Sequence, residues 1–273
     1  LKAEKINFNL STEKSFQTIC KQRLMSSNQQ LARIDYEKYF HGSKLTNIFN
    51  TFIKNIAKTD LIIVSDYGKG TIFNARKLIQ SAKKLKKKIL IDPKGKDFTK
   101  YKGANLITPN KAEFENIMGK VDSKRDLVNK AKKMLEHLNL ESLIVTLGSE
   151  GMYVLTKSNK KIIGDFINAY PQEVFDVSGA GDTTISALGA ALSEGNDIFS
   201  AAEFANLAAS ISVSKLGTST VSKDEVASLE ASKGNKEQVI VFTNGCFDII
   251  HSGHLDLLKD CLLYTSDAAD DSA

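Results

Sequence analysis

Residues 61–70 read LIIVSDYGKG, an apolar run that leads directly into a turn bounded by glycines. Helical periodicity follows over residues 72–87, and residues 89–92 form a second short run rich in β-branched side chains. A strand, a helix and another strand in this order are typical of a βαβ unit with parallel strands. Because residues 61–64 are apolar throughout, we expect a strand that is buried in the sheet.

The same alternation continues toward the C-terminus and predicts an α/β fold. Its elements are expected as strands at residues 105–108 and 142–146, helices at 111–118 and 124–138, a hairpin of 152–155 with 160–163, and Ala-rich helices at 180–193 and 200–215. The polar segment between residues 155 and 160 is typical of a hairpin turn, which places an antiparallel pair at one edge of the sheet. We therefore expect a largely parallel sheet flanked by helices.

The composition changes after Gly217, which marks a domain boundary. Residues 1–217 are expected to form the first domain, 218–237 a polar linker, and 238–273 the start of a second domain with a strand at 239–242. The last residues, 264–273, are acidic and poor in apolar side chains, so no regular structure is expected there.

Composition excludes several classes of protein. The 273 residues are 42% hydrophobic and 25% charged, as in an ordinary globular protein, and no apolar run reaches the length of a membrane span. Three scattered cysteines without a CxxC pair indicate a reducing, cytoplasmic location and no zinc site. We expect no membrane partner.

The charge pattern also speaks against a nucleic-acid partner. The formal net charge is +5, but almost all of the 37 basic residues are lysines, which lack the planar arginine fork that reads bases. The densest cluster, residues 83–88, falls at a predicted helix end, where cations are favourable. A solvated lysine face explains this cluster better than a nucleic-acid patch.

The strongest chemical signal is DVSGAGD (residues 176–182), which lies where a strand gives way to a helix. Small residues let the backbone N–H groups of Gly179, Ala180 and Gly181 approach an anion, and the helix N-terminus adds partial positive charge. Asp182 could accept a proton from a hydroxyl that attacks a bound phosphate. The alternative is a glycine-rich turn in which Asp182 is only a first-turn helix residue.

This string resembles the signature of the ribokinase-like (PfkB) sugar kinases, and three further segments agree with it in order. They are TPNKAE (108–113), TLGSEG (146–151) and FANLAA (204–209). The resemblance implies an enzyme that uses ATP and Mg²⁺, with Asp182 as the catalytic base and no side chain named as a direct metal ligand. The ATP-binding residues it implies are Asn110, Lys111, Ala112, Glu113, Thr146, Gly148, Gly151, Gly179, Ala180, Gly181 and Asn206. Taken singly, the three segments could also be a helix cap, a β-turn and a core helix.

Other strings are similar to one branch of that family. They are SNQQLARID (27–35), SDYGKG (65–70), IDPKGKDF (91–98) and KLGTSTV (215–221). The branch consists of the kinase domains that phosphorylate the anomeric hydroxyl of D-glycero-D-manno-heptose 7-phosphate, in the synthesis of ADP-heptose for lipopolysaccharide. The resemblance implies heptose phosphate and ATP as partners, and a homodimer in the full-length form.

The second domain supports the same relationship. TNGCFDIIHSGH (243–254) resembles the HxGH motif of the cytidylyltransferase-like nucleotidyltransferases, which implies nucleotide binding by Gly245 and Phe247 and catalysis of AMP transfer by His251 and His254. A metal site would need further ligands, and a surface histidine pair would leave the flanking residues unexplained.

The resemblance also implies that the chain is truncated at both ends, because the family's kinase domain begins upstream of Leu1 and its second domain continues further. Residues from about 263 onward depart from the family pattern. Two other functions stay open. One is a related kinase for ribose, fructose 1-phosphate or a nucleoside, against which the HxGH segment weighs. The other is a non-catalytic fragment that only binds nucleotide.

Overall fold

The computed structural model describes residues 6–10, 17–26, 29–40, 45–72, 74–159, 161–170 and 174–233. The expected strand at 239–242, the HxGH segment and the acidic end of the chain lie outside this part. The described chain divides into two units, Leu1–Ser222 and Lys223–Ala273, each of which is taken by itself.

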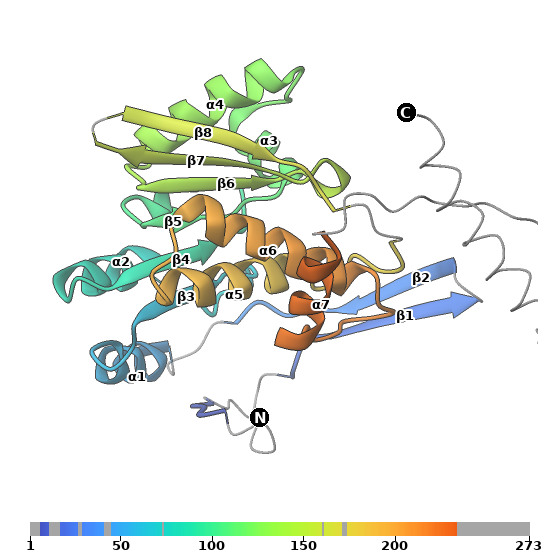
Figure 1. Ribbon diagram of the computed structural model, residues 1–273. Helices are drawn as coiled ribbons and strands as arrows, with labels where there is room; N and C mark the ends of the chain where they lie inside the picture. Colours follow the sequence, from blue (N-terminus) through green and yellow to red (C-terminus); the bar gives the residue numbers. More distant parts are fainter. Residues whose placement is uncertain are drawn as a thin grey trace, which may run out of the picture. The chain divides into compact units, whose positions relative to one another are not determined.

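A six-stranded sheet with the order β3-β4-β5-β6-β7-β8 forms the centre of the first unit (Figure 1). The strands are β3 (Leu61–Ser65), β4 (Lys88–Asp92), β5 (Leu106–Ile107), β6 (Ser142–Thr146), β7 (Met152–Ser158) and β8 (Lys161–Ile167). The first four strands are parallel, and β7 and β8 are antiparallel to their neighbours. The expected largely parallel sheet, with a hairpin at its edge, is confirmed.

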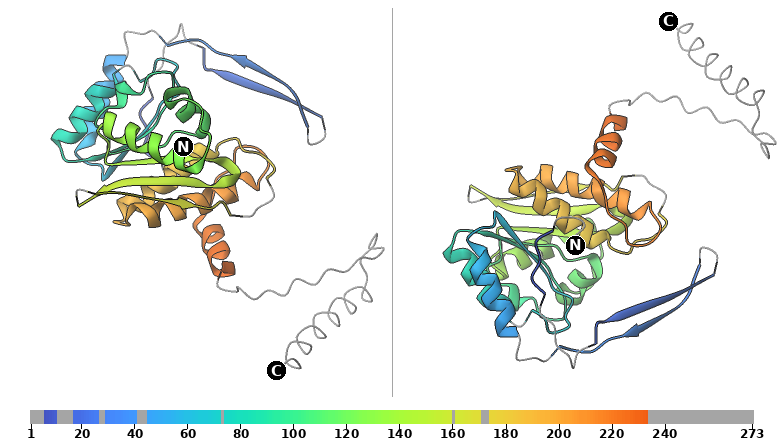
Figure 2. Two further views of the ribbon diagram at one scale, coloured as in Figure 1. Left: turned by 90° about the horizontal axis from the view of Figure 1, so that it is seen from above. Right: turned by 90° about the horizontal axis from the view of Figure 1, so that it is seen from below.

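Helices cover both faces of this sheet (Figures 1 and 2). On one face lie α5 (Ala180–Ser193) and α6 (Ile198–Val213), and on the other lie α2 (Ala75–Lys84), α3 (Lys111–Met118) and α4 (Lys124–His137), with α1 (Leu45–Ile56) against α2. Successive residues of a strand point to opposite faces of the sheet and pack into two different hydrophobic cores. Ile89 and Ile91 of β4 join the core under α2 and α4, whereas Leu90 joins the core under α5 and α6.

Helix α2 is shorter than the periodicity predicts, because local polar contacts set its ends. The Asn74 side chain accepts a hydrogen bond from the Lys77 N–H at 3.0 Å, which starts the helix after Asn74 rather than at residue 72. At the other end the Lys86 backbone has a φ of 54°, which stops the helix after Lys84. The helices at 111–118 and 180–193 have the expected bounds.

The expectation that residues 61–64 form a buried strand is wrong for the described chain, because β3 is the edge strand of the sheet. Ile63 is 40% exposed, and only Val64 of the four is buried. An apolar run indicates a strand in a hydrophobic layer but does not say which strands lie beside it. Helix α5 covers one face of β3 closely, since a Cβ at Gly189 would come within 2.7 Å of Ile63 Cδ1.

A two-stranded antiparallel sheet, β1 (Cys20–Ser26) with β2 (Gln29–Tyr36), precedes the main sheet and was not expected from the sequence (Figure 2). Its described apolar side chains, such as Ile34, are exposed, so these residues do not form the buried face that makes a strand recognisable. The Arg23 guanidinium donates a hydrogen bond to Ser178 Oγ at 3.1 Å, which connects this ribbon to the glycine-rich loop.

The second unit is described only by α7 (Lys223–Lys233), a helix in the segment expected to be a linker. Within the described ranges, no helix combines the length and apolar character needed to cross a membrane.

Candidate active site

The carboxyl ends of the parallel strands open into a polar cavity of about 160 Å³. Residues predicted from the sequence line much of it: Asn110, Glu113, Thr146, Gly179, Gly181 and Asp182. Ligands of open α/β sheets bind at this edge, because the loops after neighbouring strands meet there. The segments 108–113 and 176–182, which lie far apart in the sequence, therefore contribute to one cavity.

The glycine-rich loop places Asp182 at the start of α5. Gly179 takes the left-handed conformation with a φ of 86°, which favours glycine, and the helix begins at the next residue. A Cβ added at Gly181 would meet nothing within 4 Å, so the space beside the helix N-terminus is open. The loop thus presents backbone N–H groups and a first-turn carboxylate to the cavity.

The phenol of Tyr67, in the turn after β3, is the hydrogen-bond partner of Asp182. Its oxygen lies 2.9 Å from Asp182 Oδ1 and 3.0 Å from Oδ2. Burial of the phenol is the largest cause that raises the pKa of Tyr67 above its ordinary value, and its hydrogen bond to the Asp182 carboxylate is the second. The phenol is therefore the proton donor in this contact.

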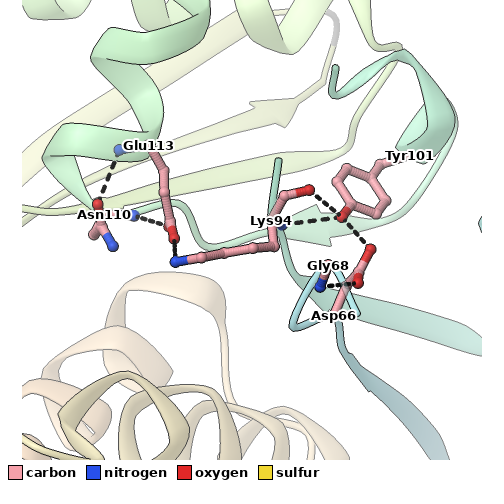
Figure 3. Close-up of polar contacts among 6 residues, drawn as sticks. All are labelled: Asp66, Gly68, Lys94, Tyr101, Asn110 and Glu113. Atoms are coloured by element: carbon pink, nitrogen blue, oxygen red, sulfur yellow. Dashed lines mark hydrogen bonds and ion pairs between the residues drawn. The ribbon is translucent and has the colours of Figure 1, made fainter. Parts of the chain in front are cut away.

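Asn110 and Glu113 form a capping box at the start of α3 (Figure 3). Asn110 Oδ1 accepts from the Glu113 N–H at 2.9 Å, and Glu113 Oε2 accepts from the Asn110 N–H at 3.0 Å. The second carboxylate oxygen, Oε1, is 2.5 Å from Lys94 Nζ. The helix-cap interpretation is therefore correct, and it leaves the outer oxygen of Glu113 available to a cation.

Asp92, at the end of β4, is a further carboxylate in this cavity. Burial is the largest cause that raises the pKa of Asp92 to about 7, and the negative charges of Glu113 and Asp182 raise it further, while Lys94 opposes them. The Asp92 carboxyl is thus shielded from water and lies near two other carboxylates. Lys94 is the one cationic side chain among the described residues that line this cavity.

A buried network holds the loops after β3 and β4 together (Figure 3). Tyr101, at the end of η1 (Thr99–Tyr101), donates its phenolic hydrogen to Asp66 Oδ2 at 2.7 Å and accepts from the Lys94 N–H at 3.0 Å. The Lys100 ammonium also contacts Asp66 Oδ2 at 2.7 Å, and Asp66 Oδ1 accepts from the Gly68 N–H at 2.7 Å. Asp66 and Tyr101 are both buried, so these bonds form a rigid support beneath the cavity.

A larger, more apolar cavity of about 670 Å³ adjoins the first, and the two share Thr146, Gly181 and Thr184. The predicted residues that line it are Thr146, Gly148, Gly151, Ala180, Gly181 and Asn206. The Asn206 amide donates a hydrogen bond to the Asn168 carbonyl at 2.8 Å, so it fixes the chain after β8 against α6. An apolar cavity beside a polar, glycine-lined one suits a molecule with a flat apolar part and a charged tail.

Two predicted residues line neither cavity. Lys111 forms a partly exposed ion pair with Glu150 at 3.3 Å, and Ala112 lies in the first turn of α3. The predicted residues Gly245, Phe247, His251 and His254 lie outside the described part of the chain.

In the polar cavity, the lining residues that sequence reasoning missed are Tyr67, Asp92, Lys94, Thr108 and Thr184. Tyr67, Asp92 and Thr108 each follow a parallel strand or end one, and this position is the signal that could have identified them. The strings that contain Tyr67, Asp92 and Lys94 were singled out only for their resemblance to a family.

The sequence matches a protein family and is similar to known proteins. The sequence pattern of the pfkB family carbohydrate kinases matches residues 36–225. A protein named bifunctional protein HldE from Shewanella piezotolerans is 42% identical over 266 residues, covering 89% of this chain and 55% of its own length. Its namesake from Haemophilus influenzae (strain PittEE) is 38% identical over 284 residues, covering 95% and 58%. The chain thus spans little more than half the length of these relatives.

Solved structures with the same fold include two sugar or sugar-phosphate kinases. Phosphofructokinase-2 from Escherichia coli, solved with substrates and products, has a TM-score of 0.62 at 18% identity, covering 78% of this chain and 69% of that one. Ribokinase from Arabidopsis thaliana, solved with ribose and ATP, has a TM-score of 0.58 at 20% identity, covering 74% and 65%.

The fold and the site together define a ribokinase-like α/β protein with an acidic cavity at the carboxyl ends of its strands. The sequence pattern then identifies the family: the chain belongs to the pfkB family of carbohydrate kinases. The fold expected from the sequence resemblance is confirmed.

Proposed function

We propose that the chain transfers the γ-phosphoryl group of ATP to a sugar phosphate, with Asp182 as the base. The observation that carries this proposal is the position of the Asp182 carboxylate, in the first turn of α5 beside the open space at Gly181 and in one cavity with Glu113 and Lys94. Phosphoryl transfer needs positioning, charge neutralisation and a proton acceptor, and this cavity offers each of them.

In the proposed step, an acceptor hydroxyl oxygen bonds to the γ-phosphorus while its proton passes to Asp182. The bond between the γ-phosphorus and the bridging oxygen breaks, and its electron pair leaves with ADP. The N–H groups of Gly179, Ala180 and Gly181 would stabilise the negative charge of the phosphoryl group. The apolar cavity around Gly148 and Asn206 would hold the adenine.

Magnesium fits the acidic part of this cavity. The Asp92 and Glu113 carboxylates lie close enough for one to raise the pKa of the other, and the Lys94 ammonium already neutralises Glu113. Mg²⁺ is commonly held by one or two carboxylates together with substrate phosphates, so Asp92 and Glu113 would hold it. When bound, it would neutralise charge on the phosphates. Lys94 could then contact the transferred phosphoryl group.

The acceptor we propose is D-glycero-D-manno-heptose 7-phosphate, phosphorylated at its anomeric hydroxyl to the 1,7-bisphosphate. The support is the set of strings at 27–35, 65–70, 91–98 and 215–221, together with relatives that are named bifunctional. A second activity, AMP transfer to heptose 1-phosphate by His251 and His254 in a complete second domain, rests on the sequence resemblance alone. The domain limits, the homodimer and the cytoplasmic location also stay predictions.

The test is a kinase assay with ATP, Mg²⁺ and a panel of sugar phosphates, sugars and nucleosides. We expect transfer to heptose 7-phosphate, and Asp182→Asn should lower turnover by about 10²–10⁴-fold with little change in ATP affinity. Glu203→Gln, at a site on α6 that lines neither cavity, is the control. Transfer to ribose, fructose 1-phosphate or a nucleoside instead would identify a different kinase of the family. ATP binding without any transfer would leave only the nucleotide-binding function.

A further inference from the structure

The Tyr67 phenol is in direct contact with Asp182, the proposed base. Its oxygen lies within hydrogen-bonding distance of both oxygens of Asp182, at 2.9 and 3.0 Å. An acceptor hydroxyl that gives its proton to Asp182 must make the same kind of contact. The phenol therefore occupies the place on the base that an incoming hydroxyl needs.

The backbone on both sides of Tyr67 is held firmly. Asp66 is only 4% exposed, and its carboxylate accepts from the Gly68 N–H, the Tyr101 phenol and the Lys100 ammonium. The Asp66 N–H donates to the Asp92 carbonyl at 3.0 Å, which joins the turn to the end of β4. These contacts fix where the Tyr67 side chain starts.

The Tyr67 side chain itself is not held by the core. It is 55% exposed, so rotation away from Asp182 would exchange its contact with the carboxylate for hydrogen bonds to water. Asp182 lies in the first turn of α5, whose Leu188 is fully buried against the sheet. In this pair, the phenol is the member that can move.

Resting on the function proposed above, we propose that Tyr67 is a displaceable substitute for the acceptor hydroxyl, bound to Asp182 until the sugar arrives. While it is bound, a water molecule cannot take the same position. In its absence, a water oxygen could bond to the γ-phosphorus, pass its proton to Asp182 and release ADP and phosphate. Tyr67 would thus favour sugar over water as the acceptor, as a specificity residue.

The kinetic test uses Tyr67→Phe, which keeps the ring and removes only the hydroxyl. Two results are expected, both because one competing hydrogen bond to the base is lost. ATP hydrolysis without sugar should rise roughly threefold to tenfold, and the KM of the acceptor should fall by a similar factor. Tyr36→Phe, which changes an equally exposed tyrosine of β2, is the matched control and should do neither.

If Tyr67 instead orients Asp182 during transfer, Tyr67→Phe will lower kcat and leave the acceptor KM unchanged. That result, or sugar-free hydrolysis equal to that of the wild type, would overturn the proposal.

A second measurement does not depend on activity. In protein with ¹³C-labelled tyrosine, the ring resonance of Tyr67, identified by its loss in Tyr67→Phe, should shift when Asp182 is replaced by Asn. An unchanged resonance would show that the two side chains do not meet, which overturns the proposal. A wild-type chain that phosphorylates no sugar, but shows this shift, would refute the proposed kinase function while the Tyr67–Asp182 contact stands.

Discussion

Replacement of Asp92 by Asn should make the protein more stable, although Asp92 lies in the candidate active site. Burial and the neighbouring charges of Glu113 and Asp182 raise the pKa of Asp92 to about 7 from an ordinary value of 3.8. The native protein therefore binds this proton more tightly than the unfolded chain does. Ionisation of Asp92 costs stability, and Asp92→Asn removes the ionisable group while keeping nearly the same shape.

The size of the effect follows from the pKa. A difference of about three pKa units between the folded and unfolded states corresponds to at most about 4 kcal/mol above pH 7. Asp92 is only half-buried, and solvent screens its charge, so we expect about 2 kcal/mol. Because the pKa of Asp92 is higher in the folded state than in the unfolded chain, its ionisation lowers the stability of the wild type as the pH rises. The advantage of the variant should be small near pH 4, grow as the pH rises toward 7 and stay constant above it.

Urea unfolding at pH 5, 6, 7 and 8 in the presence of EDTA, followed by circular dichroism, measures this difference. Asp97→Asn is the matched control from the same loop. Its carboxylate is exposed, and hydrogen bonds from the Thr99 side chain and from the Thr99 N–H, the latter at 2.8 Å, lower the pKa of Asp97. Loss of the Asp97 carboxylate should therefore stabilise the protein at no pH. A variant at Asp92 that is no more stable at pH 8 than the wild type, or whose advantage does not change with pH, would refute this reasoning.

Two further predictions concern the neighbouring loop. Lys94→Ala should lower kcat/KM for ATP by roughly tenfold or more, because the cavity loses the cation that contacts Glu113. Lys94→Arg should restore part of the activity, and the control Lys96→Ala should have little effect. Equal rates for Lys94→Ala and the wild type would contradict a role of Lys94 in ATP use. Tyr101→Phe should lower the free energy of unfolding by about 1–3 kcal/mol, because the buried Asp66 carboxylate loses one of its three donors and the Lys94 N–H loses its acceptor. A loss below about 0.5 kcal/mol in urea unfolding would show that the network gives no support.

Much of the fold could be predicted because its signals are local. Short apolar runs separated by helical periodicity indicated the parallel strands, and the residues that start α3 and α5 lie in the sequence beside the helices they begin. The glycine-rich loop was recognisable for the same reason, since its function depends on the conformation of adjacent residues such as Gly179. Resemblance to a family then suggested which of these residues meet in space.

What the sequence by itself determined is therefore the order of the strands and helices from β3 to α6, the turn before α5 and the carboxylate at Asp182. The tertiary structure alone decided that β3 lies at the edge of the sheet formed by the described residues, and that the Tyr67 phenol meets Asp182, 115 residues further along. It also decided that Lys94 neutralises Glu113 and that burial beside two carboxylates raises the pKa of Asp92. These properties depend on distance and solvent exclusion between residues remote in sequence, and no local pattern encodes a distance of that kind.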